Sequence, residues 1–141
     1  MVDTDSEGMR PDNLWHSLSS RYQPGDPAAP KFIYTNPTGC NPCGTVLPIA
    51  RKREIYDICR EYDMVIIEDD PYYYMQFGEE REASFLSIDR DARVMRLDSL
   101  SKVMSSGIRL GFLTGPKPLV DKVVLHMQVS FGRLYLIFHY T

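Results

Sequence analysis

The segment SLSK at residues 99–102 carries the side chains whose chemistry is most evident from their type and spacing. A lysine held at the end of a strand becomes a nucleophilic amine when burial or a neighbouring cation favours its neutral form. Lys102 follows a β-prone run and is therefore a candidate to form a Schiff base with a carbonyl compound. Ser99, Ser101 and Arg109 supply hydroxyls and a planar fork of N–H donors, which are the groups that hold a phosphate.

A phosphate held beside a reactive lysine predicts a site for the cofactor pyridoxal phosphate (PLP). This cofactor needs an acid against its ring nitrogen, because a protonated ring withdraws electrons from the substrate. Asp70, at the end of the run MVIIEDD, is the candidate for that role. Tyr73, three residues later, and Asn41, in a proline-rich loop, are candidates to donate hydrogen bonds to the phenolic oxygen of the ring.

These side chains must be positioned by the elements that precede them. Residues 31–35 (KFIYT) and 64–67 (MVII) are predicted strands, and the continuous apolar run of the second is typical of a strand covered on both faces. Residues 36–48 contain three prolines and two glycines and are predicted to form a long shaped loop. Two further strands are predicted at residues 93–97 and 108–114.

Three other segments have the spacing of apolar residues that is typical of a helix. They contain Leu14, Trp15 and Leu18, then Ile55, Ile58, Cys59 and Tyr62, and finally Val120, Val123, Val124 and Met127. In the second of these, the basic residues 51–53 are predicted to lie on a solvated face. The order of strands and helices predicts an α/β protein with a mostly parallel sheet, in which ligands bind beyond the carboxyl ends of the strands.

The composition limits the class of protein and of partner. The chain has 141 residues, of which 43% are hydrophobic and 25% charged, as is typical of a soluble globular chain of at most one domain. The formal charge of -3 excludes a global positive field, so nucleic acid is not an expected partner. The sequence has no apolar run long enough to cross a bilayer and no targeting peptide, which predicts an intracellular soluble protein without a membrane partner.

Cys40, Cys43 and Cys59 are predicted to be free thiols, because an odd number of cysteines without a secretion signal is typical of a reducing compartment. The pair Cys40-x-x-Cys43 could suggest a zinc or redox motif. It lacks a second pair of ligands, since the three histidines lie far away in the sequence. No metal site is therefore expected.

Three motifs, in their order and separations, resemble those of the class I aminotransferases of PLP fold type I. They are NPCG at residues 41–44, DPYY at residues 70–73, and SLSK at residues 99–102 followed by Arg109. The sequence around and between these motifs looks closest to the kynurenine/2-aminoadipate aminotransferase branch, as in IIEDDPYYYMQF and SLSKVMSSGIRLGFLTGPKPL. The ordered set is far more specific than any one of its motifs.

The resemblance implies a role for each candidate side chain. The implied catalytic residues are Lys102 as Schiff-base lysine and general base, Asp70 as partner of the ring nitrogen, and Tyr73. The implied cofactor-binding residues are Asn41, Asp70, Tyr73, Ser99, Ser101, Lys102 and Arg109. Residues 36–39 (NPTG) also match the family's Asn-Pro-x-Gly pattern, and residues 41–44 are preferred because they follow another Pro-x-Gly directly. Cys40 and Cys43 stand where the family usually has small polar residues.

The resemblance also implies that residues 1–130 form the central portion of an aminotransferase large domain, truncated at both ends. The small-domain arginine that binds the substrate carboxylate in the family is expected to lie outside this chain. Residues 131–141 (FGRLYLIFHYT) do not resemble the family and are interpreted as a foreign tail with an aggregation-prone core. A chain that supplies only part of a parallel sheet is expected to fold poorly and to be inactive alone.

The function implied is PLP-dependent transamination of 2-aminoadipate, kynurenine or a related aromatic or dicarboxylic amino acid, with a 2-oxoacid as acceptor. The family implies a homodimer, and the sequence is compatible with mitochondria and with the cytoplasm. One alternative is a non-catalytic fragment that binds PLP or a protein partner. Another is a different reaction on the same fold, such as that of a β-lyase, a decarboxylase or a sensor domain.

Overall fold

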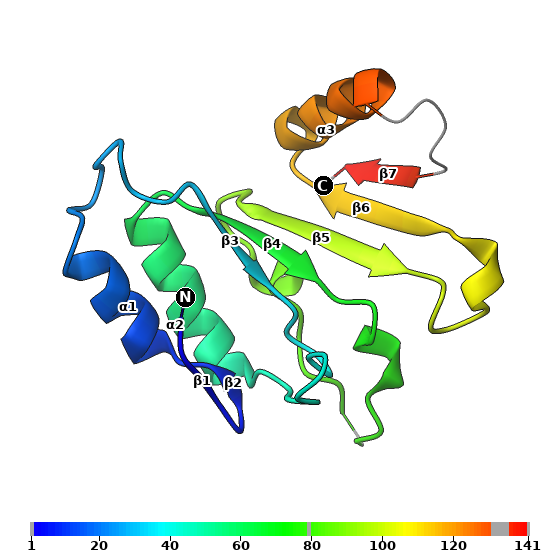
Figure 1. Cartoon of the computed structure of the whole chain (residues 1–141), viewed down its shortest axis with the longest axis horizontal. Coiled ribbons are helices and arrows are strands. Elements are labelled where there is room, and N and C mark those ends of the chain that lie inside the picture. The colour runs from blue at the N-terminus through cyan, green and yellow to red at the C-terminus, as the bar shows by residue number, and fades with distance from the viewer. Residues whose placement is uncertain (1, 79, 131–135, 141) are drawn as a thin grey trace.

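The computed structural model describes residues 2–78, 80–130 and 136–140 (Figure 1). The α-helices are α1 (Pro11–Ser19), α2 (Ile49–Glu61) and α3 (Lys117–Ser130). The strands are β1 (Thr4–Asp5), β2 (Gly8–Met9), β3 (Phe32–Thr35), β4 (Val65–Asp69), β5 (Val94–Ser99), β6 (Gly111–Gly115) and β7 (Leu136–Tyr140). Short 3-10 helices are η1 (Tyr73–Met75), η2 (Leu86–Ile88) and η3 (Ser106–Ile108).

The main sheet has the strand order β3-β4-β5-β6-β7. Strand β4 runs parallel to β3 and to β5, and β7 runs parallel to β6, which confirms the α/β class and the mostly parallel sheet. Strand β6 runs antiparallel to β5. The cause is the short connection between them, a turn and η3, because a parallel pairing needs a long crossover that returns the chain to the other end of the sheet.

Helix α2 supplies much of the hydrophobic core. Ile55, Cys59 and Tyr62 are buried, as their spacing predicts, because residues three and four apart share one face of a helix. The prediction that residues 51–53 all face solvent is wrong for Lys52, which is fully buried. Its Nζ donates a hydrogen bond of 2.7 Å to the backbone oxygen of Ala83, and this bond offsets part of the cost of burying an ammonium group.

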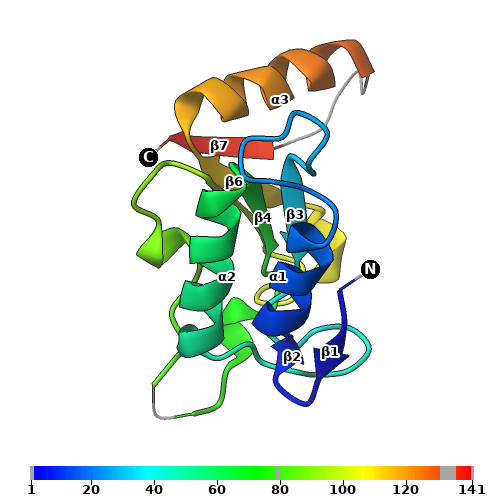
Figure 2. The ribbon, with the colours of Figure 1, turned by 90° about the vertical axis from the view of Figure 1, so that its left-hand side faces the viewer.

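Helices α1 and α2 lie side by side and cover one face of the sheet (Figure 2). Leu14 and Leu18 of α1 point into the core. The prediction that Trp15 shares their face is wrong, because its side chain is 50% exposed and adjacent helical residues point in different directions. The prediction that residues 64–67 are covered on both faces is also wrong within the described chain, since Ile66 is buried and its neighbours Val65 and Ile67 are only partly buried.

Strand β7 lies in the segment that the sequence analysis interprets as a foreign tail. It pairs with β6 over its whole length, from Gly111 with Leu136 to Gly115 with Tyr140. Residues 131–135 and 141 of that predicted tail lie outside the described residues. Among the described helices, none combines the length and the apolar character needed to span a membrane. The described side chains also contain no group of three or more His, Cys, Asp or Glu residues arranged to hold a metal ion.

Candidate functional site

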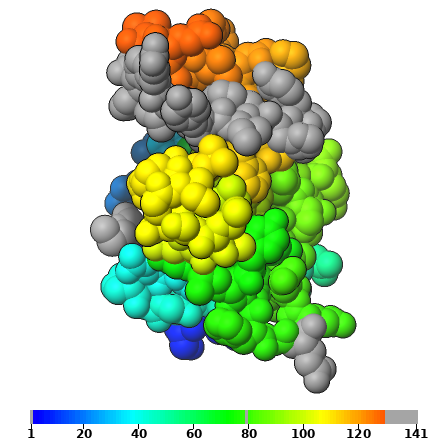
Figure 3. All heavy atoms as spheres, turned by 90° about the vertical axis from the view of Figure 1, so that its right-hand side faces the viewer, coloured from blue at the N-terminus to red at the C-terminus, as the bar shows by residue number. Residues whose placement is uncertain are grey.

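The residues predicted from the sequence lie on segments that adjoin one edge of the main sheet. Strands β3, β4 and β5 run parallel, so their carboxyl ends share an edge, and the antiparallel β6 begins at that edge, where Gly111 pairs with Ser99. Figure 3 shows the segment after β5, in yellow, beside the segments after β4, in green, and after β3, in cyan. The residues at this edge are Asn41, Asp70, Tyr73, Ser99, Ser101, Lys102 and Arg109.

Asp70 is the most deeply buried of these residues, with 1% of its surface exposed. Its backbone N–H donates to the oxygen of Leu97 at 3.0 Å, so it is held directly after the last residue of β4. Its Oδ2 accepts a hydrogen bond of 3.1 Å from Nη1 of Arg96. Its Oδ1 is buried and accepts no hydrogen bond in the described part of the chain, although the nearby side chain of Thr38, whose buried Oγ1 also has no hydrogen-bond partner there, acts to lower the pKa of Asp70. Such an oxygen is unusual in a folded protein and is available to a donor on a ligand.

Arg96 joins acids from two strands in the buried interior. Its Nε and Nη2 donate to both oxygens of Asp98, at 2.8 and 2.9 Å. Its Nη1, besides bonding Asp70, lies 3.4 Å from Oε2 of Glu68. The guanidinium also lies over the ring of Tyr73, 4.4 Å from the ring centroid. Arg96 therefore links the predicted ring-nitrogen acid to the predicted phenol donor.

The electrostatics of this region follow from its burial. Burial raises the pKa of Asp70 and of Glu68, because a carboxylate loses hydration in the interior, and the charge of Arg96 opposes both shifts. Burial lowers the pKa of Lys52, and the charges of Glu68 and Asp70 oppose that shift. Although burial also acts against the charged form of Arg96, hydrogen bonding to Asp98 and the other acids raise its pKa above the ordinary value.

Lys102 lies in the turn that follows β5, and its side chain is exposed. The turn begins with a hydrogen bond of 3.2 Å from the backbone N–H of Ser101 to Oγ of Ser99. The Nζ atom of Lys102 lies 5.4 Å from the centroid of the Tyr72 ring, which is within the range of a cation–π interaction. The lysine therefore contacts the loop that begins at Asp70.

Arg109 approaches the same turn from the start of β6. A hydrogen bond of 3.0 Å from the N–H of Leu100 to the oxygen of Leu110 holds the two segments together. The close approach requires Gly111, because a Cβ atom there would lie 2.9 Å from the backbone oxygen of Asp98. Arg109 has a φ of 53°, a left-handed conformation that is uncommon for residues other than glycine, and its guanidinium is exposed.

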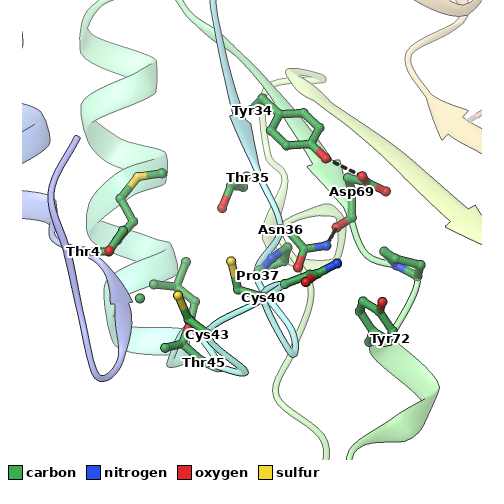
Figure 4. Close-up of a pocket in the computed structure, with 15 residues that line it drawn as sticks. Thr4, Tyr34, Thr35, Asn36, Pro37, Cys40, Cys43, Thr45, Asp69 and Tyr72 are labelled. Atoms are coloured by element: carbon green, nitrogen blue, oxygen red, sulfur yellow. Dashed lines mark hydrogen bonds between the residues drawn. The ribbon is translucent and has the colours of Figure 1, made fainter. Parts of the chain in front are cut away.

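A cavity of about 510 Å³ lies beside this edge, between the loop after β3 and the loop after β4 (Figure 4). Of the seven predicted site residues, only Asn41 lines this cavity. Tyr72, which was not among them, lines it as well. Asn36, from the other Asn-Pro-x-Gly segment, donates a hydrogen bond of 2.6 Å to the backbone oxygen of Asp69. Tyr34 donates to the side chain of the same Asp69. Asn36 thus ties the two loops together, whereas Asn41 is exposed in its loop.

The sequence reasoning missed Arg96 and interpreted Tyr72 only as a residue that packs at the edge of the core. Arg96 had a usable signal, because it is two residues after the buried Val94 and so faces the covered side of β5, where a charged side chain needs partners. Tyr72 had no such signal. Its position under the amine of Lys102 depends on how two loops meet.

The fold and the order of the motifs define a class of protein. A model of the aminotransferase class I and II family matches residues 12–134, and the chain belongs to this family. Over 134 residues it is 53% identical to the mitochondrial kynurenine/α-aminoadipate aminotransferase of Bos taurus. That match covers 92% of this chain and 31% of the relative. The resemblance drawn from the three motifs is therefore confirmed.

Solved structures lead to the same family. A kynurenine aminotransferase of Pyrococcus horikoshii, solved in complex with PMP and kynurenine-related ligands, matches with a TM-score of 0.85 and 28% identity over 92% of this chain and 32% of that chain. An α-aminoadipate aminotransferase of Thermus thermophilus, complexed with N-(5'-phosphopyridoxyl)-L-leucine, matches with a TM-score of 0.80 and 30% identity over the same shares. The chain spans about a third of the length of these relatives.

Proposed function

We propose that this chain forms the cofactor-binding part of a PLP-dependent aminotransferase. The substrate would be 2-aminoadipate, kynurenine or a related aromatic or dicarboxylic amino acid, with a 2-oxoacid as acceptor. The observation that carries the proposal is the buried, unpartnered Oδ1 of Asp70 at the same sheet edge as the amine of Lys102. Relatives named for kynurenine and α-aminoadipate support the choice of substrates.

The residues at the sheet edge fit the chemical groups of this cofactor. Oδ1 of Asp70 is an acceptor for the ring N–H, and Lys102 would hold the aldehyde carbon. Tyr73 and Asn41 are O–H and N–H donors suited to the phenolic oxygen. The phosphate would be bound by the hydroxyls and the guanidinium that follow β5, namely those of Ser99, Ser101 and Arg109.

When bound, PLP stabilises the negative charge that develops on the substrate α-carbon. The chain's own residues would do the remaining work. Lys102 would take the proton from the α-carbon as general base, and its exposed side chain at a turn has the freedom to move toward that atom. Asp70, buried beside Arg96, would keep its charge against the ring nitrogen in a medium where water screens it little.

Covalent capture of the cofactor tests this function directly. The full chain is mixed with PLP, the visible absorption band is recorded, and borohydride reduction followed by peptide mapping locates the pyridoxyl group. We expect the band and a stable pyridoxyl tag on Lys102, and K102A should lose both. A tag spread evenly over the exposed lysines would contradict the proposal.

The substrate is tested separately with the longer protein of which such a chain would be part. Amino-group transfer from 2-aminoadipate or kynurenine to 2-oxoglutarate is expected, and it should disappear when Lys102 is replaced by alanine. Release of ammonia or carbon dioxide without formation of a new amino acid would favour a different PLP reaction over transamination.

A further inference from the structure

The buried side chains around Asp70 form a charge cluster with an uneven balance. The cluster consists of Lys52 on α2, Glu68 and Asp70 at the end of β4, and Arg96 and Asp98 on β5. The side chains of Glu68 and Asp70 are 0% exposed, those of Arg96 and Asp98 are 7% exposed, and Lys52 is 0% exposed. Two cations therefore face three acids, and the fully ionised cluster carries one net negative charge.

The groups around the cluster do not correct this imbalance. Tyr73 covers Arg96 with a neutral ring. Glu82 faces Lys52 from the loop before η2, but it is only half-buried and its Oε2 accepts a hydrogen bond of 2.9 Å from the first N–H of α2, at Ile49. An uncompensated charge in a protein interior is costly, so a buried acid of this kind takes up a proton.

The hydrogen bonds of Arg96 determine which carboxylate oxygen of Asp70 has no donor. Its fork is committed to Asp98 through Nε and Nη2, so only Nη1 reaches Asp70, and it reaches Oδ2 alone. Oδ1 therefore accepts no hydrogen bond from Arg96, and it has no other hydrogen-bond partner among the described residues. The same Nη1 lies 3.4 Å from Glu68, whose oxygens also accept the backbone N–H groups of Phe85 and Leu86. Glu68 and Asp70 thus share one cationic nitrogen.

We propose that Arg96 is a positioning residue for Asp70, and that the Glu68–Asp70 pair stores one proton until a basic nitrogen, neutral or already protonated, reaches Oδ1 of Asp70. The inference rests on the proposed function, because the group that arrives would be the ring nitrogen of PLP. At that moment the carboxyl O–H bond breaks. The proton goes to the ring nitrogen, which gains an N–H bond, or to water when the nitrogen already carries a proton. In either case all five groups of the cluster are then charged, and the positive charge on the ring nitrogen balances the net negative charge of the cluster.

The proposal is tested on the cofactor-free full chain by nuclear magnetic resonance of its side-chain carboxyl carbons as the pH is changed. In the wild type, one proton should remain on the Glu68–Asp70 pair at neutral pH. The variant E68Q removes one negative charge and keeps an oxygen for the N–H of Phe85. It should lower the apparent pKa of Asp70 by about one to three pH units.

The variant R96M removes the cation from the same cluster, and it should raise the apparent pKa of Asp70 by a similar amount. Opposite shifts from two substitutions that both disturb the interior distinguish an electrostatic positioning role from a loss of packing. The matched control is R90M, which removes an exposed guanidinium paired with Asp57 and should leave the titration of Asp70 unchanged.

An Asp70 pKa that is unchanged or raised in E68Q would overturn the proposal by itself, whatever the fold of R96M. A wild type in which both carboxyls are ionised at neutral pH would also overturn it. The pyridoxyl tag on Lys102 is measured on the same preparations, so the two proposals fail separately. If Lys102 is tagged but the two pKa shifts are not opposite, the proposed function is supported and the inference about the stored proton is wrong. If the shifts are opposite but Lys102 is not tagged, the inference is supported and the proposed function is wrong.

Discussion

The two halves of the candidate site are built in opposite ways. The acid half consists of Asp70, Glu68 and Arg96, which lie between β4 and β5, are almost fully buried and bond one another. The lysine half consists of the turn after β5 and the start of β6. Lys102 and Arg109 are exposed there, and the amine of Lys102 is placed only against one aromatic ring among the described residues.

This difference shows which half of the site the protein positions without a ligand. Charges in the interior interact strongly and are screened little by water, so the acid half is defined by the fold alone. The exposed cations of the lysine half lose most of their interaction energy to solvent. We therefore expect the acid half to contribute to stability without any ligand. The lysine half should contribute little until a phosphate or a carbonyl group is bound.

The largest expected effect concerns the two arginines, one in each half. R96M leaves buried carboxylates without their cation and should lower the free energy of unfolding by about 3–5 kcal/mol. R109M changes an exposed side chain and should alter it by no more than about 0.5 kcal/mol. Urea unfolding followed by circular dichroism measures both. Equal losses in the two variants would abolish the distinction between the halves.

A buried and an exposed cysteine should also differ in the rate at which their thiols are alkylated. Cys59 lies on the buried face of α2 with 0% of its surface exposed, and burial raises its pKa to about 12, whereas Cys43 is exposed in the loop that carries Asn41. Only the thiolate reacts with an alkylating agent, so iodoacetamide at mildly alkaline pH should modify Cys43 at least about 100-fold faster than Cys59. Mass spectrometry of timed samples gives both rates, and urea should remove the difference. Similar rates in the absence of urea would mean that α2 does not cover the sheet.

A smaller effect is expected at the neighbouring acid, Asp69. Tyr34 donates a hydrogen bond to Asp69, and this bond raises the pKa of Tyr34 to about 12 from the ordinary value of 10.0. A raised pKa stabilises the folded chain below the ordinary value, and this contribution is lost as the pH rises through about 12. D69N should shift the ionisation of one tyrosine to lower pH in an absorbance titration, and Y34F should remove it. Superimposable curves for wild type and D69N would exclude the bond.

Much of this fold could be predicted because local patterns and tertiary packing agree. The apolar residues of α2 recur at helical spacing, and polar residues follow the strands at the edge where the parallel strands end. The antiparallel β6 had only the short connection after β5 as a signal. The family could be predicted because the order of NPCG, DPYY and SLSK is specific, and the family match confirms it.

What could not be predicted depends on partners far away in the sequence. Lys52 looks like part of a solvated basic triplet, and its burial depends on a carbonyl 31 residues later, at Ala83. Arg96 is one residue of a short strand, and its role depends on acids at positions 68, 70 and 98 that meet only when the sheet forms. Spacing within one element carries no information about such contacts. The roles of the seven site residues remain predictions in the same way, because they depend on a ligand.

The most direct test of the central claim is the selectivity of pyridoxyl labelling and its dependence on Asp70. Lys102 lies at the carboxyl edge of the sheet, whereas Lys31 precedes β3 at the opposite edge and is also exposed. Borohydride reduction with limiting PLP should tag Lys102 about tenfold more than Lys31, a preference worth about 1.4 kcal/mol. D70A should reduce that ratio to about one, and D69N should leave it unchanged. Equal tagging of the two lysines in the wild type, or a preference that survives D70A, would contradict a site built from the amine of Lys102 and the carboxylate of Asp70.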